Sequence, residues 1–161
     1  MIPAFRGYNC AMDKQELENF LLSARTKTYA GAQGKTRSAL EGSVQYEHKL
    51  GDLLYRDIYY LGNGIFPGLE TIYYKDKPVW SMSYFGDFSK MTEDQADAML
   101  RRALIDNQKS ARIYKHVEKD YGDFKYICEG EGTIDVLSGT EEIFVENEMI
   151  YVFYYAGGFV G

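Results

Sequence analysis

The stretch Gly51–Phe88 reads GDLLYRDIYYLGNGIFPGLETIYYKDKPVWSMSYFGDF. It aligns without a gap with Gly122–Phe159, which reads GDFKYICEGEGTIDVLSGTEEIFVENEMIYVFYYAGGF. The offset is constant at 71 residues, so that Tyr84, for example, aligns with Tyr155. Other glycines, glutamates and tyrosines are also identical between the two stretches, and several further positions are conservative pairs. A constant offset over this length indicates one supersecondary unit that is built twice.

A helix is expected in front of each copy. Asp13 can cap the first helix, with Glu16 completing a capping box. Thr92 and Gln95 form the same pattern at the start of the second helix. Apolar residues then recur at helical spacing and form one stripe on each helix. The stripes are Leu17, Phe20, Leu21 and Ala24 in the first helix, and Ala96, Met99, Leu100, Ala103 and Leu104 in the second.

The copies themselves read as strands. In the first copy, Asp52–Tyr60, Thr71–Tyr74 and Val79–Phe85 mix aromatic, β-branched and polar residues, and turn signals separate them. The expected turns are Gly62–Gly64, Pro67–Gly68 and Lys75–Lys77. In the second copy, the expected strands Ile143–Val145 and Ile150–Tyr155 flank a turn at Glu146–Glu148.

Alternating residues of the last strand in each copy share one face, which is expected to pack against the helices. These residues are Trp80, Met82, Tyr84, Tyr151, Phe153 and Tyr155.

Together these patterns predict an α+β fold. We expect half-repeats 13–88 and 92–159, each a helix followed by an antiparallel β-meander, packed as one pseudo-twofold domain over residues 1–161.

Composition excludes several classes of function. The formal net charge is −6, which argues against binding a nucleic acid polymer, because that requires a basic footprint. There is no run of the ~20 apolar residues that a membrane span needs, and no signal peptide, so no membrane partner is expected. Cys10 and Cys128 are isolated, which indicates free thiols in a cytoplasmic protein and no metal site. No cofactor is implied.

The segment Gly31–Thr36 resembles a phosphate-binding loop but does not match it. The first glycine of that motif would stand where Tyr29 stands, and the segment follows a helix rather than a strand. Two interpretations remain. The glycines can form an anion-binding nest supported by Lys27, Lys35 and Arg37, or the segment is a flexible connection between helix and strand.

Fifteen tyrosines are the second unusual feature. Adjacent pairs such as Tyr59–Tyr60 place one ring on each face of a sheet, so one ring can stack on a ligand or partner. Tyrosine is also simply a good strand former. Between these rings Arg56 can hold a phosphate or carboxylate and Asp57 points to the other face, whereas the second copy has Ile127 and Cys128 at these positions. Any site is therefore expected to be asymmetric and weighted to the first half.

Glu70 and Glu141 recur at the constant offset. Recurrence favours a structural role, and we expect these carboxylates to accept N–H groups of the turns near Gly68 and Gly139.

Three segments, Thr28–Gly31, Tyr55–Tyr60 with a following glycine, and Lys77–Gly86, resemble an uncharacterised bacterial domain family. Its members occur alone or fused to helix-turn-helix regulators. The resemblance covers most of the chain and implies no known activity, but the fused members imply a sensor. The present chain lacks a DNA-binding segment.

The sequence thus favours a non-enzymatic module, a sensor or a sequestering protein, for a small anionic, nucleotide-like ligand. One alternative is a protein-interaction or self-association domain that uses a tyrosine-rich sheet face. The other is an enzyme of lyase or phosphodiesterase type using His48, Arg56 and Asp57, although no catalytic motif is present. The candidate ligand-binding residues are Tyr29, Lys35, Arg56, Asp57, Tyr59 and Trp80, and no catalytic or metal-binding residue is predicted.

Overall fold

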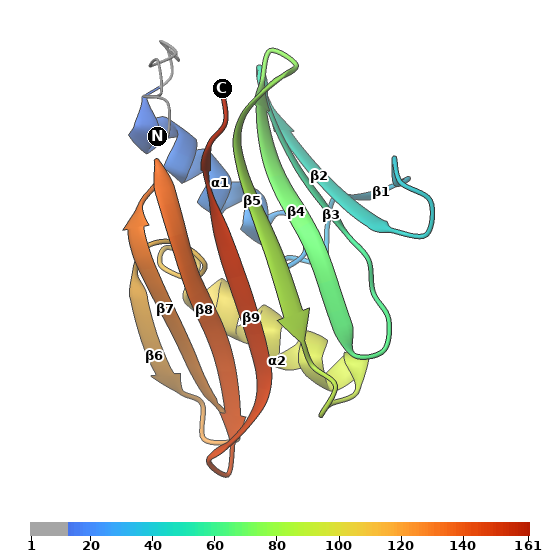
Figure 1. The fold of residues 1–161 in the computed structure, drawn as a ribbon, viewed down its shortest axis with the longest axis vertical. Coiled ribbons are helices and arrows are strands. Elements are labelled where there is room, and N and C mark those ends of the chain that lie inside the picture. Colours follow the sequence, from blue (N-terminus) through green and yellow to red (C-terminus); the bar gives the residue numbers. More distant parts are fainter. Residues whose placement is uncertain (1–12) are drawn as a thin grey trace, which may run out of the picture.

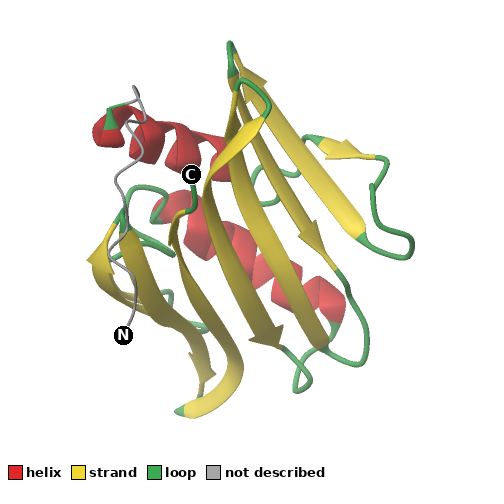
Figure 2. Cartoon of the chain, turned by 45° about the horizontal axis from the view of Figure 1, so that its top comes forward, coloured by secondary structure: helices red, strands yellow, loops and turns green. Residues whose placement is uncertain are grey.

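A computed structural model describes residues 13–161 of the chain. They form one antiparallel sheet of nine strands, in the order β1-β2-β3-β4-β5-β9-β8-β7-β6, with helices α1 and α2 behind it on the same face (Figure 1). The α+β class expected from the sequence is confirmed. Within residues 13–161 the opposite face of the sheet carries no helix, and the edge formed by β1 and β2 extends past both helices (Figures 1 and 2).

The bounds of the elements are as follows. The helices are α1 (Lys14–Thr26) and α2 (Glu93–Asp106). The strands before α2 are β1 (Lys35–Thr36), β2 (Val44–Leu50), β3 (Leu53–Tyr59), β4 (Ile65–Tyr74) and β5 (Lys77–Asp87). The strands after it are β6 (His116–Asp120), β7 (Lys125–Thr133), β8 (Val136–Val145) and β9 (Glu148–Phe159).

Both helices begin where the capping residues predict. The Asp13 side chain accepts the backbone N–H of Gln15, and Thr92 forms a complete capping box with Gln95. In the described part of the chain, neither helix is both long and apolar enough to cross a membrane.

One expected turn is wrong. Pro67 and Gly68 lie inside β4, where Pro67 lies opposite Phe85 of β5 and Gly68 pairs with both β5 and β3. The glycine is needed for packing rather than for a turn, because a Cβ at Gly68 would lie 2.3 Å from a ring carbon of Tyr84. The turn at Gly62–Gly64 and the hairpin at Lys75–Asp76 lie where expected.

Strands β1, β2 and β6 have no counterpart among the expected elements. Strands β1 and β6 are the two edges of the described sheet, and β2 pairs with β1 only at Gln45 and Tyr46, so most of one side of β2 is unpaired as well. Charged residues are common in strands of this kind. Their sequences therefore lack the apolar alternation that identifies the inner strands.

The expected core is confirmed. Its six residues on β5 and β9 are between 0% and 9% exposed, and the Trp80 indole N–H donates to the Ile134 carbonyl. Cys128 is a buried free thiol, whereas Cys10 lies outside the described residues. At the centre of the sheet, β5 pairs with β9 so that Tyr84 lies opposite Tyr155.

A polar cluster lies within this core. The Glu70 carboxylate accepts hydrogen bonds from two nitrogens of Arg25, at distances from 2.6 to 3.2 Å, and from the hydroxyl of Tyr55. Glu141 receives two nitrogens of Arg112 at 2.8–3.2 Å. Both glutamates therefore have the structural role that recurrence indicates, but their partners are buried arginines and tyrosines rather than turn N–H groups. Burial explains the difference, since a carboxylate inside a core requires a countercharge.

Candidate functional site

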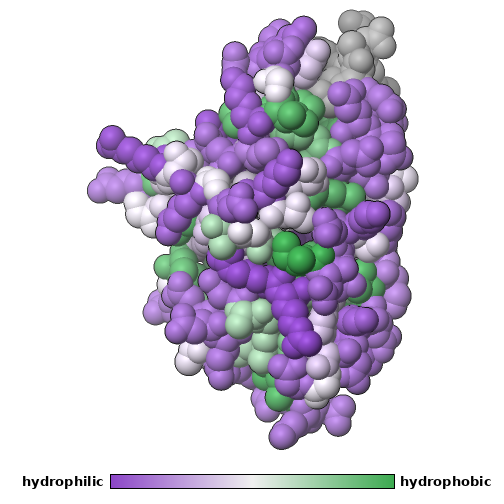
Figure 3. Space-filling view, turned by 180° about the vertical axis from the view of Figure 1, so that it is seen from behind, coloured by the Kyte–Doolittle hydropathy of each residue, from purple (hydrophilic) through white to green (hydrophobic). Residues whose placement is uncertain are grey.

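A cavity of about 240 Å³ lies between the first half of the sheet and α2. Strands β1–β5 supply one wall, and the N-terminal part of α2 supplies the other. This is the helix-bearing side of the molecule, where hydrophilic residues predominate and hydrophobic residues form separate patches (Figure 3). The cavity is slightly smaller than the ~300–1,000 Å³ typical of sites for drug-sized ligands, so it suits a single ring system.

Six aromatic side chains line the cavity. Tyr46 and Tyr59 have nearly parallel rings, with an angle of 9° between the planes and centroids 6.4 Å apart. The edge of Tyr29 meets Tyr46, and Phe66 meets Tyr59, so the aromatic surface is continuous. Flat rings of this kind offer stacking surfaces to a planar ligand. Tyr84 and Phe88 complete the aromatic lining.

Asp57 lies at the buried end of the cavity and is only 6% exposed. Its Oδ1 accepts a short hydrogen bond from the Tyr84 hydroxyl. Burial, reinforced by the negative charge of Glu70, raises the pKa of Asp57 from 3.8 to about 7. Burial and the nearby Asp57 also raise the pKa of Tyr84, which keeps its hydroxyl protonated as a donor.

The raised pKa of Asp57 predicts a pH-dependent stability. Between about pH 4 and pH 7 the folded protein binds more protons at Asp57 than the unfolded chain does. Its contribution to the free energy of unfolding therefore falls with rising pH, by up to about 1.4 kcal/mol per pH unit, and stays constant above that range. Urea unfolding of the wild type and of Asp57→Asn, repeated across this pH range, measures how this contribution changes with pH. A constant difference between the two proteins would contradict the prediction.

The exposed rim of the cavity is charged. Lys35 on β1 takes part in no ion pair or side-chain hydrogen bond within residues 13–161. Arg101 lies over the ring of Tyr29, with its guanidinium carbon 4.5 Å from the centroid, and one of its nitrogens is 3.5 Å from Asp97. Asp97 also accepts the Tyr29 hydroxyl at 2.6 Å, and Glu93 is the remaining rim carboxylate. Of these rim charges, Lys35 is therefore the cation most available to an anionic group.

Four of the six sequence-predicted site residues line this one cavity: Tyr29, Lys35, Asp57 and Tyr59. The structure does not bring the other two to it. Trp80 is fully buried in the core, and Arg56 lies on the opposite face of the sheet.

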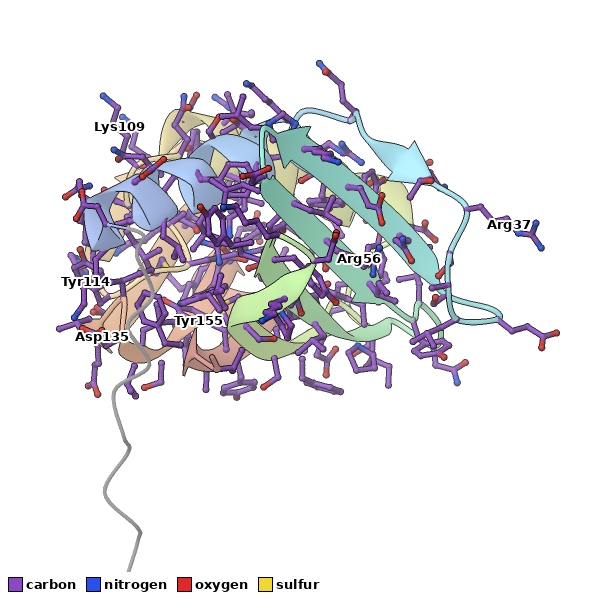
Figure 4. The ribbon with its side chains drawn as sticks, turned by 90° about the horizontal axis from the view of Figure 1, so that it is seen from above. Arg37, Arg56, Lys109, Tyr114, Asp135 and Tyr155 are labelled. Carbon is purple, nitrogen blue, oxygen red and sulfur yellow. The ribbon has the colours of Figure 1, made fainter. Side chains whose placement is uncertain are left out.

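There Arg56 pairs with Glu47 at 2.7 Å and lies over Tyr73. Alternation along β3 explains the separation of Arg56 from Asp57, since neighbouring strand residues point to opposite faces. Arg37, which the sequence suggested as a further cation, follows β1 and points away from the body of the protein (Figure 4).

Sequence reasoning did not include several of the lining residues in the site. Tyr46 lies on the unexpected strand β2, and Asp97 and Arg101 lie on the polar side of α2. Phe66 is the second residue of β4, and Phe88 directly follows β5. In the sequence, both lie beside expected turns or strand ends. The i, i+4 spacing of Asp97 and Arg101 indicates that both side chains lie on one face of the helix, but it does not show which part of the sheet that face meets.

Among the described residues, the space that would correspond to this cavity in the second half is filled at the position equivalent to Tyr59. Gly130 stands 71 residues after Tyr59, and a Cβ at Gly130 would lie 1.7 Å from the Ile113 carbonyl oxygen. The connection 107–115 between α2 and β6 therefore packs directly on the sheet. In the first half the longer connection 27–43 runs to the sheet edge and forms β1, which leaves the space beside Tyr59 unfilled.

The trio considered for catalysis does not share a site. Asp57 faces the cavity, Arg56 lies on the other face, and His48 stacks on Phe20 away from both. Within residues 13–161, no group of three or more His, Cys, Asp or Glu side chains is arranged to hold a metal ion.

Comparison with known proteins identifies a family. The model of DUF5680, a domain of unknown function, matches residues 57–160, about two thirds of the chain. The chain belongs to this family. The DUF5680 match begins at Asp57 and includes the part of the cavity formed by β4, β5 and α2, whereas Tyr29, Lys35 and Tyr46 precede it. Comparisons with curated proteins and with solved structures gave no match.

Proposed function

We propose that this protein is a small-molecule-binding module whose ligand occupies the cavity between α2 and strands β1–β5. The observation that carries the proposal is the buried carboxyl of Asp57, which accepts a single hydrogen bond from the described residues and lies at the end of a cavity lined by aromatic rings. Cavities that combine aromatic side chains with converging polar groups are typical of ligand sites. Such a module suits a sensor or a protein that sequesters a signal.

The rim favours an anionic ligand. Asp97 is already engaged by Tyr29 and Arg101, whereas Lys35 has no partner among the described residues. A ligand with a flat ring and an anionic group would place the ring among the tyrosines and the anion near Lys35 and Arg101. Nucleotides have this combination of groups.

A thermal-shift screen with nucleotides, nicotinamide-derived nucleotides, cyclic dinucleotides and small acids tests the proposal. A ligand at about 100 times its Kd is expected to add about 2.7 kcal/mol to the free energy of unfolding. Tyr59→Ala should abolish the shift, while Tyr60→Ala is the matched control, because Tyr60 lines the hollow on the opposite face. A folded protein that shows no shift with any compound would contradict the proposal.

We also infer that the two halves are one unit built twice around a pseudo-twofold axis between β5 and β9. Pairing of Tyr84 with Tyr155 supports this, because each is the counterpart of the other at the offset of 71. Register shifts at Ile72/Tyr73 and Ile143/Phe144 stand at the same offset. The two glutamate–arginine clusters agree with it as well.

The helix-free face of the sheet supports a second candidate function, binding of a protein partner or of a second copy. A hollow of about 300 Å³ on that face is lined by Arg56, Tyr60, Leu69 and Tyr73 among others. Tyr60 and Leu69 are nearly half exposed. We favour the cavity because the hollow on this face, as lined within residues 13–161, includes no buried carboxyl comparable to Asp57.

A further inference from the structure

Asp57 is short of hydrogen-bond donors. Tyr84 donates to Oδ1, and within residues 13–161 no hydrogen bond or ion pair involves Oδ2. The nearby arginines cannot easily serve, because Arg25 and Arg112 are bound by their own glutamates. An ionised carboxylate accepts about four hydrogen bonds. A ligand that enters the cavity therefore meets an acceptor with unused capacity.

The fold does not require this carboxyl. At the position 71 residues further on stands Cys128, and the tyrosine equivalent to Tyr84 donates instead to the Ile113 carbonyl at 2.7 Å. The second half thus satisfies the same hydroxyl without an acid. Asp57 carries the energetic penalty of burial at a place where the sheet borders a cavity. Its chemistry is therefore best assigned to the ligand.

We propose that the cavity takes a nucleobase whose edge carries two adjacent N–H donors, a guanine-type edge, with these donors bound to Asp57 and the phosphate near Lys35 and Arg101. This inference rests on the proposed function. The volume of about 240 Å³ admits a base but leaves the sugar and phosphate at the rim.

The two acceptor oxygens of the Asp57 carboxylate favour guanine over the other bases. The N1–H and 2-amino groups of guanine both donate, and so they match the two oxygens of a carboxylate. Adenine and cytosine present a donor beside an acceptor, which would place a lone pair against a carboxylate oxygen. Hypoxanthine retains N1–H but lacks the amino group, so it measures the contribution of one donor.

The test is a calorimetric titration of the wild-type protein with GMP, IMP and AMP, repeated with Asp57→Asn. GMP is expected to bind about tenfold to a hundredfold more tightly than IMP, because a hydrogen bond to a charged group is lost in IMP. AMP should bind more weakly still. In Asp57→Asn the amide offers one donor and one acceptor, so the preference for GMP over AMP should disappear. Asp76→Asn, the same chemical change at an exposed turn residue outside the cavity lining, should retain the preference.

Equal affinities for the three nucleotides, or a preference for GMP that survives in Asp57→Asn, would overturn the inference. The comparison of the three nucleotides on the wild-type protein needs no variant, so it tests the inference even if Asp57→Asn folds poorly. If the three nucleotides do not bind but another compound of the screen occupies the cavity, the guanine-type ligand is wrong and the binding function stands. If no compound binds, both proposals fail.

Discussion

Glu141→Gln is expected to lower the free energy of unfolding by about 3–5 kcal/mol. Glu141 is 0% exposed and accepts two nitrogens of Arg112 and the hydroxyls of Tyr126 and Tyr151. A neutral amide leaves the Arg112 guanidinium buried without a countercharge, and desolvation of an unpaired charge is among the largest single destabilising effects. Urea unfolding followed by circular dichroism measures the change.

Glu142→Gln is the matched control. It makes the same chemical change one residue away, at a half-buried position with no ion pair among residues 13–161, and should alter stability by no more than about 0.5 kcal/mol. The double variant Glu141→Leu/Arg112→Met should recover much of the loss, since it removes both charges. Equal free energies of unfolding for the two glutamine variants would show that the buried pair of Glu141 and Arg112 does not stabilise the fold.

Gly130→Ala is expected to lower the free energy of unfolding by at least about 3 kcal/mol, near the upper end for overpacking. The added Cβ would lie 1.7 Å from the Ile113 carbonyl oxygen and 2.8 Å from the backbone nitrogen of Lys115. Both neighbours are backbone atoms, so no side-chain rotation relieves the contact. The connection 107–115 would have to move off the sheet, which thermal unfolding should report as a large drop in Tm.

Gly62→Ala provides the comparison. A Cβ at Gly62 meets no atom within 4 Å. Since the turn there has room for a methyl group, its stability should change by no more than about 0.5 kcal/mol. Equal losses in both variants would show that the packing of Ile113 on β7 is not what requires a glycine at Gly130.

Local patterns were sufficient for the helices and for strands β3, β5 and β9. Capping residues and apolar stripes predict α1 and α2, and the alternation on β5 and β9 identifies the six core residues, because these signals act between residues close in sequence. The turn wrongly expected at Pro67–Gly68 shows the limit of such reasoning. Glycine there meets a tyrosine from the next strand, and a contact of that kind leaves no local signature.

The candidate site divides in the same way. Sequence reasoning placed Tyr29, Lys35, Asp57 and Tyr59 in one site, and all four line the cavity. It could not place the partners from α2, because a helix is attached to the sheet by loops whose course depends on packing. Arg56 was included although strand alternation already separates it from Asp57.

By itself, then, the sequence determined the class of fold, the helices, strands β3, β5 and β9, and the asymmetry between Asp57 and Cys128, because each depends on periodicity or on identity at a known offset. Only the tertiary structure decided where a cavity lies. That depends on two connections of unequal length: residues 107–115 pack on the sheet against Gly130, and residues 27–43 run out to its edge. Space between layers is determined by the packing of distant segments, which no local pattern encodes.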